Sequence, residues 1–290
     1  MIEHFNAGIN EVELTDVSDF DLQKIFECGQ CFRWEVDESI LPDKSDNKND
    51  HYIGVAYDRV VKLRKTNTSI FISGSINDYK TIWHDYFDLN RNYTKIRRQL
   101  CTDDFMKRAT EFGKGIRLLR QDKWEALCSF IISQNNNIPR IKSIIDMLCR
   151  EFGDVIEFEN DRYYSFPSAN KLAKTNIEDL VSLRCGYRAD YIISAAKMID
   201  TGAIDLDKLA ENTPQFARAE LKKIRGVGDK VADCVLLFGL HMLDAFPLDV
   251  WMKRAVEQHY GPDFDPGIFD PYAGIAQQYI FHYMRNGEKR

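Results

Sequence analysis

The sequence predicts an α+β fold in which an N-terminal antiparallel β-sheet is followed by a larger helical part. Up to about residue 74, segments rich in β-branched and aromatic residues alternate with short polar breaks, a pattern typical of antiparallel strands. From residue 76 onward, apolar residues recur every three or four positions, as in helices with one buried face. The chain has 290 residues, 44% of them hydrophobic, which is enough for two or three packed subdomains.

The β part is predicted to contain a short helix around residues 22–27 and a small sheet with one covered face. Its strands are expected at residues 32–35, 51–57, 60–64 and 69–73. The polar run at residues 42–50 predicts a loop before the second of these strands.

The helical part is predicted to consist of ordinary globular helices joined by short connections. They are expected at residues 79–89, 93–100, 103–112, 123–134, 139–152, 177–183, 187–200, 206–211, 214–224, 230–240, 249–260 and 271–284. No run of about 18 apolar residues is present, so we expect no transmembrane segment. The N-terminus lacks a basic region followed by an apolar one, so we expect no signal peptide.

The charge and the cysteine content limit the binding partners, the cellular compartment and the metal cofactors that we expect for this protein. The net charge of −6 and the pI of about 5.6 argue against a non-specific polyanion binder, so a DNA enzyme of this composition must concentrate positive charge locally. Seven cysteines without framework spacing suggest reduced thiols in a cytosolic compartment. Cys28 and Cys31 have the spacing of half a metal motif, but no second pair matches it, so we predict no metal cofactor.

The stretch from residue 221 to 249 predicts a helix, a glycine hairpin and a second helix. The first helix should begin at Thr213 and break at Gly226 and Gly228, after which Asp229 is expected to cap the second. Glycines can adopt positive φ and bring bare backbone close to another surface. Backbone N–H groups at a helix start bind anions, so this hairpin predicts a contact with nucleic-acid phosphates. The alternative is a plain helical turn that binds nothing.

Lys230 and Asp249 are the candidate reactive pair. Lys230 is expected in the first turn of the second helix, where the positive end of the helix dipole disfavours a cation. Asp249 follows a Phe-Pro break, where a new helix should start with its carboxylate free. An amine at a positive helix end, with a carboxylate nearby, suits a lysine that reacts unprotonated as a nucleophile. The alternative is a surface lysine and a structural N-cap.

Residues 226–233 (Gly-Val-Gly-Asp-Lys-Val-Ala-Asp) and 247–250 (Pro-Leu-Asp-Val) resemble the helix-hairpin-helix signature of base-excision DNA glycosylases, and the lysine marks the subset with lyase activity. Five further motifs resemble the 8-oxoguanine DNA glycosylases and occur in that family's order over nearly the whole chain. They are 29–34 (Gly-Gln-Cys-Phe-Arg-Trp), 118–122 (Leu-Leu-Arg-Gln-Asp), 135–140 (Asn-Asn-Asn-Ile-Pro-Arg), 186–189 (Gly-Tyr-Arg-Ala) and 271–274 (Pro-Tyr-Ala-Gly).

The resemblance implies a sheet domain over residues 1–90 and two all-helical subdomains with a cleft between them. One covers 123–240 and carries the helix-hairpin-helix; the other joins 91–122 to 241–290 and completes a base pocket. It implies a bifunctional enzyme of base excision repair that excises 8-oxoguanine from double-stranded DNA, prefers cytosine opposite the lesion, and cleaves the abasic strand by β-elimination. We expect no cofactor, no membrane contact and a monomer, located at the nucleoid in the cytoplasm of a prokaryote or in the nucleus of a eukaryote.

The resemblance also assigns the reacting groups. The amine of Lys230 would attack C1′ of the damaged nucleotide and form a Schiff base, and Asp249 would stabilise the developing positive charge on the sugar. The base must leave the duplex to be reached, so a pocket is required. Gly29 is expected to read the lesion: N7 of guanine is an acceptor, whereas N7 of 8-oxoguanine carries a hydrogen that a backbone carbonyl can accept. A plain turn glycine is the alternative.

The remaining base contacts are likewise implied by the resemblance. Gln277 would meet the Watson–Crick edge of the base, with Phe281 against one face and Cys234 against the other. Gln277 and Phe281 lie four residues apart on the last predicted helix, hence on one face. This spacing equally suits a core phenylalanine, and a buried small hydrophobe is the usual fate of a free cysteine.

Asn135, Arg140, Tyr187 and Arg188 match family residues that fill the gap in the duplex and contact the orphaned base, with Tyr187 as a wedge. One position departs from the family: Trp251 stands where a phosphate-binding histidine is common. Two alternatives remain open, a glycosylase for other oxidised or alkylated bases and a non-catalytic helix-hairpin-helix DNA-binding protein.

Overall fold

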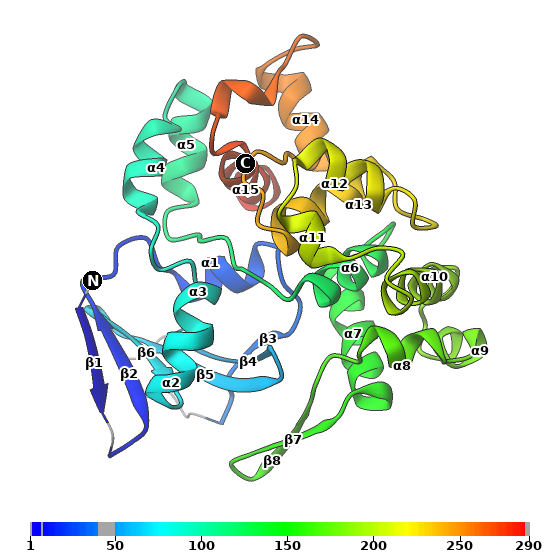
Figure 1. Ribbon diagram of the computed structural model, residues 1–290. Helices are drawn as coiled ribbons and strands as arrows, with labels where there is room; N and C mark the ends of the chain where they lie inside the picture. The colour runs from blue at the N-terminus through cyan, green and yellow to red at the C-terminus, as the bar shows by residue number, and fades with distance from the viewer. Residues whose placement is uncertain (1, 7, 40–49, 288–290) are drawn as a thin grey trace.

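The computed structural model describes residues 2–6, 8–39 and 50–287, and its architecture confirms the predicted α+β fold. An antiparallel sheet occupies the N-terminal part, and the rest of the described chain is mainly helical (Figure 1). The predicted loop at residues 42–50 lies almost wholly outside the described residues. No described helix is long and apolar enough to cross a membrane.

The sheet has six strands in the order β1-β2-β6-β5-β4-β3, all paired antiparallel. The strands are β1 (Ile2–Asn6), β2 (Glu11–Thr15), β3 (Trp34–Val36), β4 (His51–Ala56), β5 (Arg59–Lys65) and β6 (Ser69–Ser73). The sequence analysis did not predict β1 and β2, although Val12 and Leu14 alternate with polar residues as a half-buried strand should. It also started β3 two residues too early.

One face of the sheet packs on aromatic side chains and on helix α1 (Leu22–Glu27). Trp34 stacks on Phe26, with ring centroids 4.1 Å apart, and its indole N–H donates to the hydroxyl of Tyr86 at 2.8 Å. Gly54 pairs with Trp34 across the ladder, and a Cβ at this glycine would come within 2.3 Å of the indole. The indole therefore requires a glycine on the neighbouring strand.

The helical elements largely follow the predicted ranges. They are α2 (Ile76–Asp78), the π-helical η2 (Tyr79–Trp83), α3 (His84–Tyr86), α4 (Tyr93–Gln99), α5 (Asp104–Phe112), α6 (Lys123–Ile132), α7 (Ile138–Phe152), α8 (Ala169–Ala173), α9 (Ile177–Ser182), α10 (Arg188–Asp200), α11 (Leu206–Ala210), α12 (Pro214–Leu221), α13 (Asp229–Cys234), the π-helical η3 (Val235–Gly239), α14 (Val250–His259), the 3-10 turn η4 (Pro266–Phe269) and α15 (Ala273–Asn286).

Three features of the helical part differ from the prediction. The helix expected at 230–240 is α13 followed by the π-helical turn η3, where Gly239 packs closely on Ala126 of α6. The short helix α8 was not predicted. Neither was the hairpin of β7 (Val155–Phe158) and β8 (Asp161–Tyr164), whose short strands bury no residue fully and so lack a clear apolar pattern.

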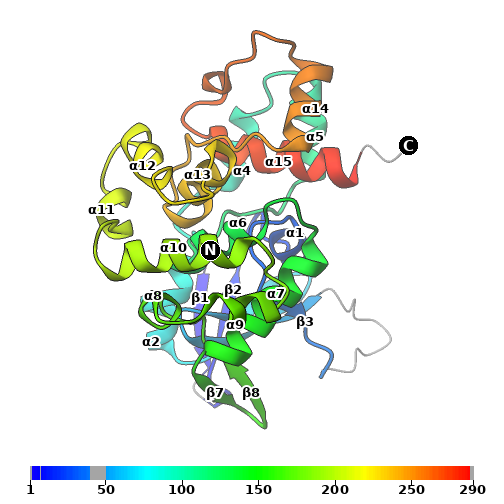
Figure 2. The same ribbon diagram turned by 90° about the vertical axis from the view of Figure 1, so that its right-hand side faces the viewer.

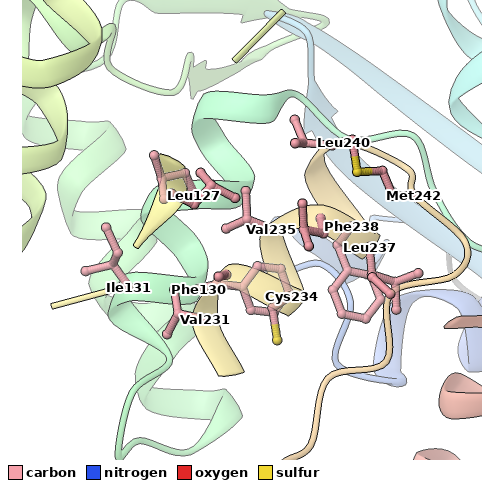
Figure 3. Close-up of a cluster of buried hydrophobic side chains, with 14 of the residues drawn as sticks. Leu127, Phe130, Ile131, Val231, Cys234, Val235, Leu237, Phe238, Leu240 and Met242 are labelled. Carbon is pink, nitrogen blue, oxygen red and sulfur yellow. The ribbon is translucent and has the colours of Figure 1, made fainter. Parts of the chain in front are cut away.

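The helices form two groups in space. Helices α4 and α5, from the middle of the chain, lie with α14 and α15 from its end (Figures 1 and 2). One hydrophobic cluster nevertheless runs through both groups, from Tyr93 to Met284, and a second cluster lies at the sheet. Figure 3 shows the part of the first cluster where α6, α13 and η3 meet. The division into three domains with the boundaries given above stays a prediction.

Candidate active site

The glycine hairpin between α12 and α13 is built as predicted, with one correction. Gly226 has φ of +81°, and a Cβ there would lie 2.1 Å from the ring of Tyr191, so only glycine fits. Gly228, in extended conformation, occupies the N-cap of α13. Asp229 is therefore the first residue of the helix and not its cap, and its carboxylate pairs with Lys222 at 2.6 Å.

A cavity of about 800 Å³ opens beside α13. Most of the predicted site residues line it, although they lie up to about 250 positions apart in the chain; they are Gly29, Asn135, Gly228, Lys230, Cys234, Asp249, Gln277 and Phe281. Gly226, Arg140, Tyr187 and Arg188 do not line the cavity. Tertiary folding thus gathers the proposed reacting and base-binding groups in one place.

The amine of Lys230 is held by a residue that the sequence analysis missed. Its Nζ lies 3.3 Å from Oγ of Ser133, the C-cap of α6. The Ser133 hydroxyl itself donates to the carbonyl of Phe130 at 2.8 Å, so its oxygen is left to accept from the amine. Nζ also lies 5.7 Å from the centroid of the Phe130 ring, which stacks on Phe238. The amine therefore has an apolar wall on one side and the hydroxyl of Ser133 as a hydrogen-bond acceptor.

Asp249 is the N-cap of α14, and its carboxylate is not free as expected. One oxygen accepts the backbone N–H of Met252 at 2.9 Å, because a helix start leaves such donors without partners. Burial raises the pKa of the Asp249 carboxyl, while the N–H groups of Met252 and Trp251 and the charge of Lys230 act to lower it. Lys230 and Asp249 line the same cavity and interact electrostatically, yet the ion pairs within 4 Å among the described residues do not include a pair between the two.

Gly29 and α15 form the far side of the cavity. Gly29 has φ of +86°, and a Cβ there would lie 3.3 Å from Cε1 of Phe281. Gln277 is only 4% exposed, and its amide donates weakly to the carbonyl of Pro247 at 3.4 Å. Its Oε1 is buried and has no hydrogen-bond partner among the described residues. A buried amide oxygen with no partner is suited to accept hydrogen bonds from a ligand.

Cys234 lies in α13 one turn beyond Lys230, lines the cavity and also belongs to the large hydrophobic cluster. Burial raises the pKa of its thiol to about 11, although Lys230 acts to lower it. The side chain is therefore a neutral thiol at pH 7 and offers an apolar, polarisable surface to the cavity.

The loop that follows α6 brings the remaining predicted residues near one another. Asn135 has φ of +47°, and its carbonyl accepts from the guanidinium of Arg188 at 3.0 Å. Arg188 is 3% exposed and also donates to the carbonyl of Gln134, so its donors hold this loop. Tyr187 is 52% exposed beside Tyr191. This exposed ring would be accessible to a duplex.

Asn137, expected in a turn, caps α7 by accepting the N–H of Arg140 at 3.0 Å. The Arg140 residue is exposed at this helix start. Trp251 lines the cavity next to Asp249, and the guanidinium of Arg254 lies 5.1 Å from the indole centroid. The described residues include no group of three or more histidine, cysteine or acidic side chains placed to hold a metal.

A glycine hairpin leading into a cavity that both Lys230 and Asp249 line is typical of the helix-hairpin-helix DNA glycosylases. Comparison with family models agrees. The N-terminal domain of 8-oxoguanine DNA glycosylase matches residues 14–127, and the HhH-GPD superfamily of base excision DNA repair proteins matches residues 128–267. The chain belongs to the 8-oxoguanine DNA glycosylase family.

Relatives and solved structures support this assignment along the whole chain. The N-glycosylase/DNA lyase of Saccharomyces cerevisiae is 32% identical over 263 residues, covering 84% of this chain and 69% of that protein. N-glycosylase/DNA lyase OGG1 of Arabidopsis thaliana is 27% identical, covering 96% and 76%. The 8-oxoguanine glycosylase/lyase of Clostridium acetobutylicum, in complex with double-stranded DNA containing cytosine opposite 8-oxoG, has a TM-score of 0.89 and 35% identity over 99% and 98% of the two chains.

Proposed function

We propose that this DNA glycosylase and DNA lyase excises 8-oxoguanine from double-stranded DNA with Lys230 as its nucleophile. The observation that carries the proposal is the single cavity that joins the Lys230 amine to Asp249 and to the base-binding candidates on α15. A non-catalytic hairpin protein would need neither the amine nor the carboxylate. Since the enzyme acts on DNA, we place it at the nucleoid of a prokaryote or in the nucleus of a eukaryote.

The proposed reaction has two stages. The lone pair of the Lys230 amine forms a bond to C1′, and the C1′–N9 bond breaks so that its electron pair and a proton leave with the base. The sugar then opens to a Schiff base on Lys230, loses a proton from C2′, and expels the 3′ phosphate by β-elimination. Asp249 lowers the barrier because its carboxylate stabilises positive charge that develops on the sugar.

Recognition of the lesion is assigned to three residues. The Gly29 carbonyl accepts the N7–H that 8-oxoguanine has and guanine lacks, while the Gln277 amide binds the Watson–Crick edge. Phe281 packs on the face of the base. Support comes from the unpartnered Oε1 of Gln277 and from the approach of Gly29 to Phe281.

An alternative substrate, an alkylated base, is suggested by the DNA-3-methyladenine glycosylase of Bacillus subtilis, which is 30% identical. That similarity covers only 57% of this chain, whereas the two N-glycosylase/DNA lyases cover 84% and 96% of it and the N-terminal domain of 8-oxoguanine DNA glycosylase matches residues 14–127. We therefore favour 8-oxoguanine over an alkylated base.

Borohydride trapping on a duplex with 8-oxoguanine tests both the chemistry and the substrate. The unmodified chain should form a covalent adduct, and Lys230→Gln should form none while retaining affinity for the lesion duplex. Lys197→Gln, which changes an exposed lysine of α10, is the control and should trap normally. Adduct formation by Lys230→Gln would refute the assignment, and trapping on a 3-methyladenine duplex alone would refute the substrate.

A further inference from the structure

Arg285 lines the same cavity as the proposed reacting groups, and no motif of the sequence points to it. It lies one turn beyond Phe281 and two turns beyond Gln277 on α15, so the three side chains share one helix face. Gln277 is buried, whereas Phe281 and Arg285 are both partly exposed. Arg285 therefore stands at the outer end of this face, where the cavity approaches solvent.

The guanidinium of Arg285 has a donor without an acceptor. Its Nη1 is buried and makes no hydrogen bond, and the described residues form no ion pair with it. Arginine carries several N–H donors in a fixed fork and is always charged. A buried donor of a charged group that lacks a partner costs free energy unless a ligand supplies one.

The charged groups around Arg285 are of both signs. Lys24 is close enough to act with Arg285 on His282, whose pKa burial and these two cations lower to about 4. Asp21 and Glu27 oppose them, but both are engaged elsewhere. Glu27 accepts from the hydroxyl of Tyr52 at 2.8 Å, and Asp21 accepts the backbone N–H of Lys24 at 3.0 Å. The Lys24 amine donates to the backbone carbonyls of Phe112 and Lys114, and the ion pairs within 4 Å among the described residues do not include it.

The position of Arg285 in α15 explains why a cation is stable there, but it does not explain why one of its donors is buried without an acceptor. Arg285 lies in the last turn of α15, where the negative end of the helix dipole stabilises a cation. The dipole does not provide an acceptor for the buried Nη1. A phosphate does, because its oxygens match the guanidinium fork.

We propose that Arg285 binds a phosphate group of the DNA strand that carries the flipped nucleotide, at the outer edge of the pocket. The proposal rests on the proposed function, since only an extruded nucleotide brings its backbone to this edge. With the edge of the base at Gln277 and its face on Phe281, the next groups outward along the nucleotide are the sugar and its phosphates. Arg285 thereby fixes the depth at which the nucleotide enters the cavity.

Lesion duplexes in which one phosphate at a time is replaced by an uncharged methylphosphonate test the contact. The unmodified chain should lose about tenfold in affinity at one position beside the lesion. Arg285→Gln should lose about tenfold in affinity for the all-phosphate duplex, and replacing the same phosphate should not lower its affinity further. The slope of its log affinity against log salt concentration should be smaller in magnitude by about one. Arg285→Lys keeps the charge and the packing and should fall between the two.

Arg98→Gln, at an exposed arginine of α4 away from the cavity, is the matched control. It should lose affinity at the same methylphosphonate positions, and by the same factors, as the unmodified chain. If Arg285→Gln and Arg285→Lys keep the sensitivity of the unmodified chain at every phosphate, the proposal is wrong. It is equally wrong if the variants lose only discrimination between 8-oxoguanine and guanine, because the guanidinium then contacts the base. Failure of the proposed function is distinguishable, since the unmodified chain would then release no 8-oxoguanine from any duplex.

Discussion

The amine of Lys230, the proposed nucleophile, has a hydrogen-bond partner, Ser133, that is distant in the chain. The two residues are 97 positions apart, and the hydroxyl that accepts from the amine belongs to the end of a different helix. Because the Ser133 hydroxyl donates its hydrogen to the Phe130 carbonyl, the amine of Lys230 is the donor and the Ser133 oxygen is the acceptor in their contact. Ser133 can therefore orient the amine without donating to it.

We expect Ser133→Ala to slow base excision under single-turnover conditions by roughly fivefold while lesion affinity changes little, since one hydrogen bond contributes about 1 kcal/mol. Ser133→Thr should restore most of the rate. Ser182→Ala is the matched control, because this hydroxyl also donates to a carbonyl three residues earlier at the end of a helix. A parallel fall in affinity and rate would mean that Ser133 is only structural.

We expect Gly29→Ala to reduce the preference for 8-oxoguanine over guanine more than it reduces affinity for any duplex. The residue has φ of +86°, and the new methyl group would press on Phe281 at 3.3 Å. Equilibrium binding to lesion and undamaged duplexes at one fixed salt concentration measures the ratio. Gly261→Ala, with φ of +85° and open space around it, separates backbone strain from crowding. An unchanged ratio in Gly29→Ala would reduce this glycine to a turn residue.

At the scale of elements, the hairpin between α12 and α13 and the last helix α15 set most of the site. The hairpin is rigid because Gly226 lies against the ring of Tyr191 in α10. Helix α15 contributes the proposed base-binding face, and it packs on α5 and α14. Substitutions in the hairpin or in the packing of α15 should therefore change stability or DNA binding by displacing the backbone of these elements, and not by removing a reacting group.

Gly226→Ala should destabilise the fold by roughly 2–4 kcal/mol, because it combines a left-handed backbone with a methyl group 2.1 Å from the Tyr191 ring. It should also weaken binding to lesion and undamaged duplexes alike, since the hairpin amides are displaced. Urea unfolding and binding at fixed salt measure the two effects. Gly202→Ala, at φ of +71° in open space, should cost only about 1 kcal/mol. Equal costs for both variants would contradict the close contact.

His282 of α15 should make stability depend on pH. Burial lowers its pKa from 6.5 to about 4, with Lys24 and Arg285 acting in the same direction, so the folded state favours the neutral ring. This contribution is present above pH 6.5 and is lost as the pH falls toward 4, by roughly 2–3 kcal/mol in total. Urea unfolding across this range should show a smaller pH dependence in His282→Gln. The exposed His4→Gln should behave like the unmodified chain, and identical curves for all three would refute the prediction.

At the scale of the whole molecule, the fold brings two separate loops to the surface beside the cavity. One follows α6 and carries Asn135, and the other precedes α10 and carries Tyr187. Arg188 ties them together through the carbonyls of Gln134 and Asn135. Since these bonds occupy Arg188, the exposed Arg140 is the better candidate for a contact with the base opposite the lesion.

We expect 8-oxoguanine to be excised faster opposite cytosine than opposite adenine, by roughly ten- to a hundredfold. Cytosine offers acceptors to an arginine, whereas adenine presents a donor, and an unmatched buried donor costs about 1–3 kcal/mol. Single-turnover rates for the two pairings measure the preference, and Arg140→Ala should reduce it. Arg150→Ala, at an exposed arginine farther along the same helix, should leave it intact. Equal rates for the unmodified chain would refute the opposite-base role.

The sequence by itself determined the α+β class, the glycine hairpin and the positions of Lys230 and Asp249 at the starts of two helices, because periodicity, turn chemistry and helix starts depend on neighbours in the chain. It also pointed to Gly29, Gln277 and Phe281 through resemblance to a family. It missed β1, β2 and the β7–β8 hairpin, and it placed the cap of α13 one residue too late.

Only the tertiary structure decided which distant residues complete the site. The acceptor for the Lys230 amine comes from α6, the carboxylate of Asp249 is used by its own helix, and Arg188 is bound by a loop. Arg285 became a candidate because the folded chain leaves its Nη1 buried without an acceptor. These contacts depend on how helices and loops pack against one another, so local sequence patterns do not predict them.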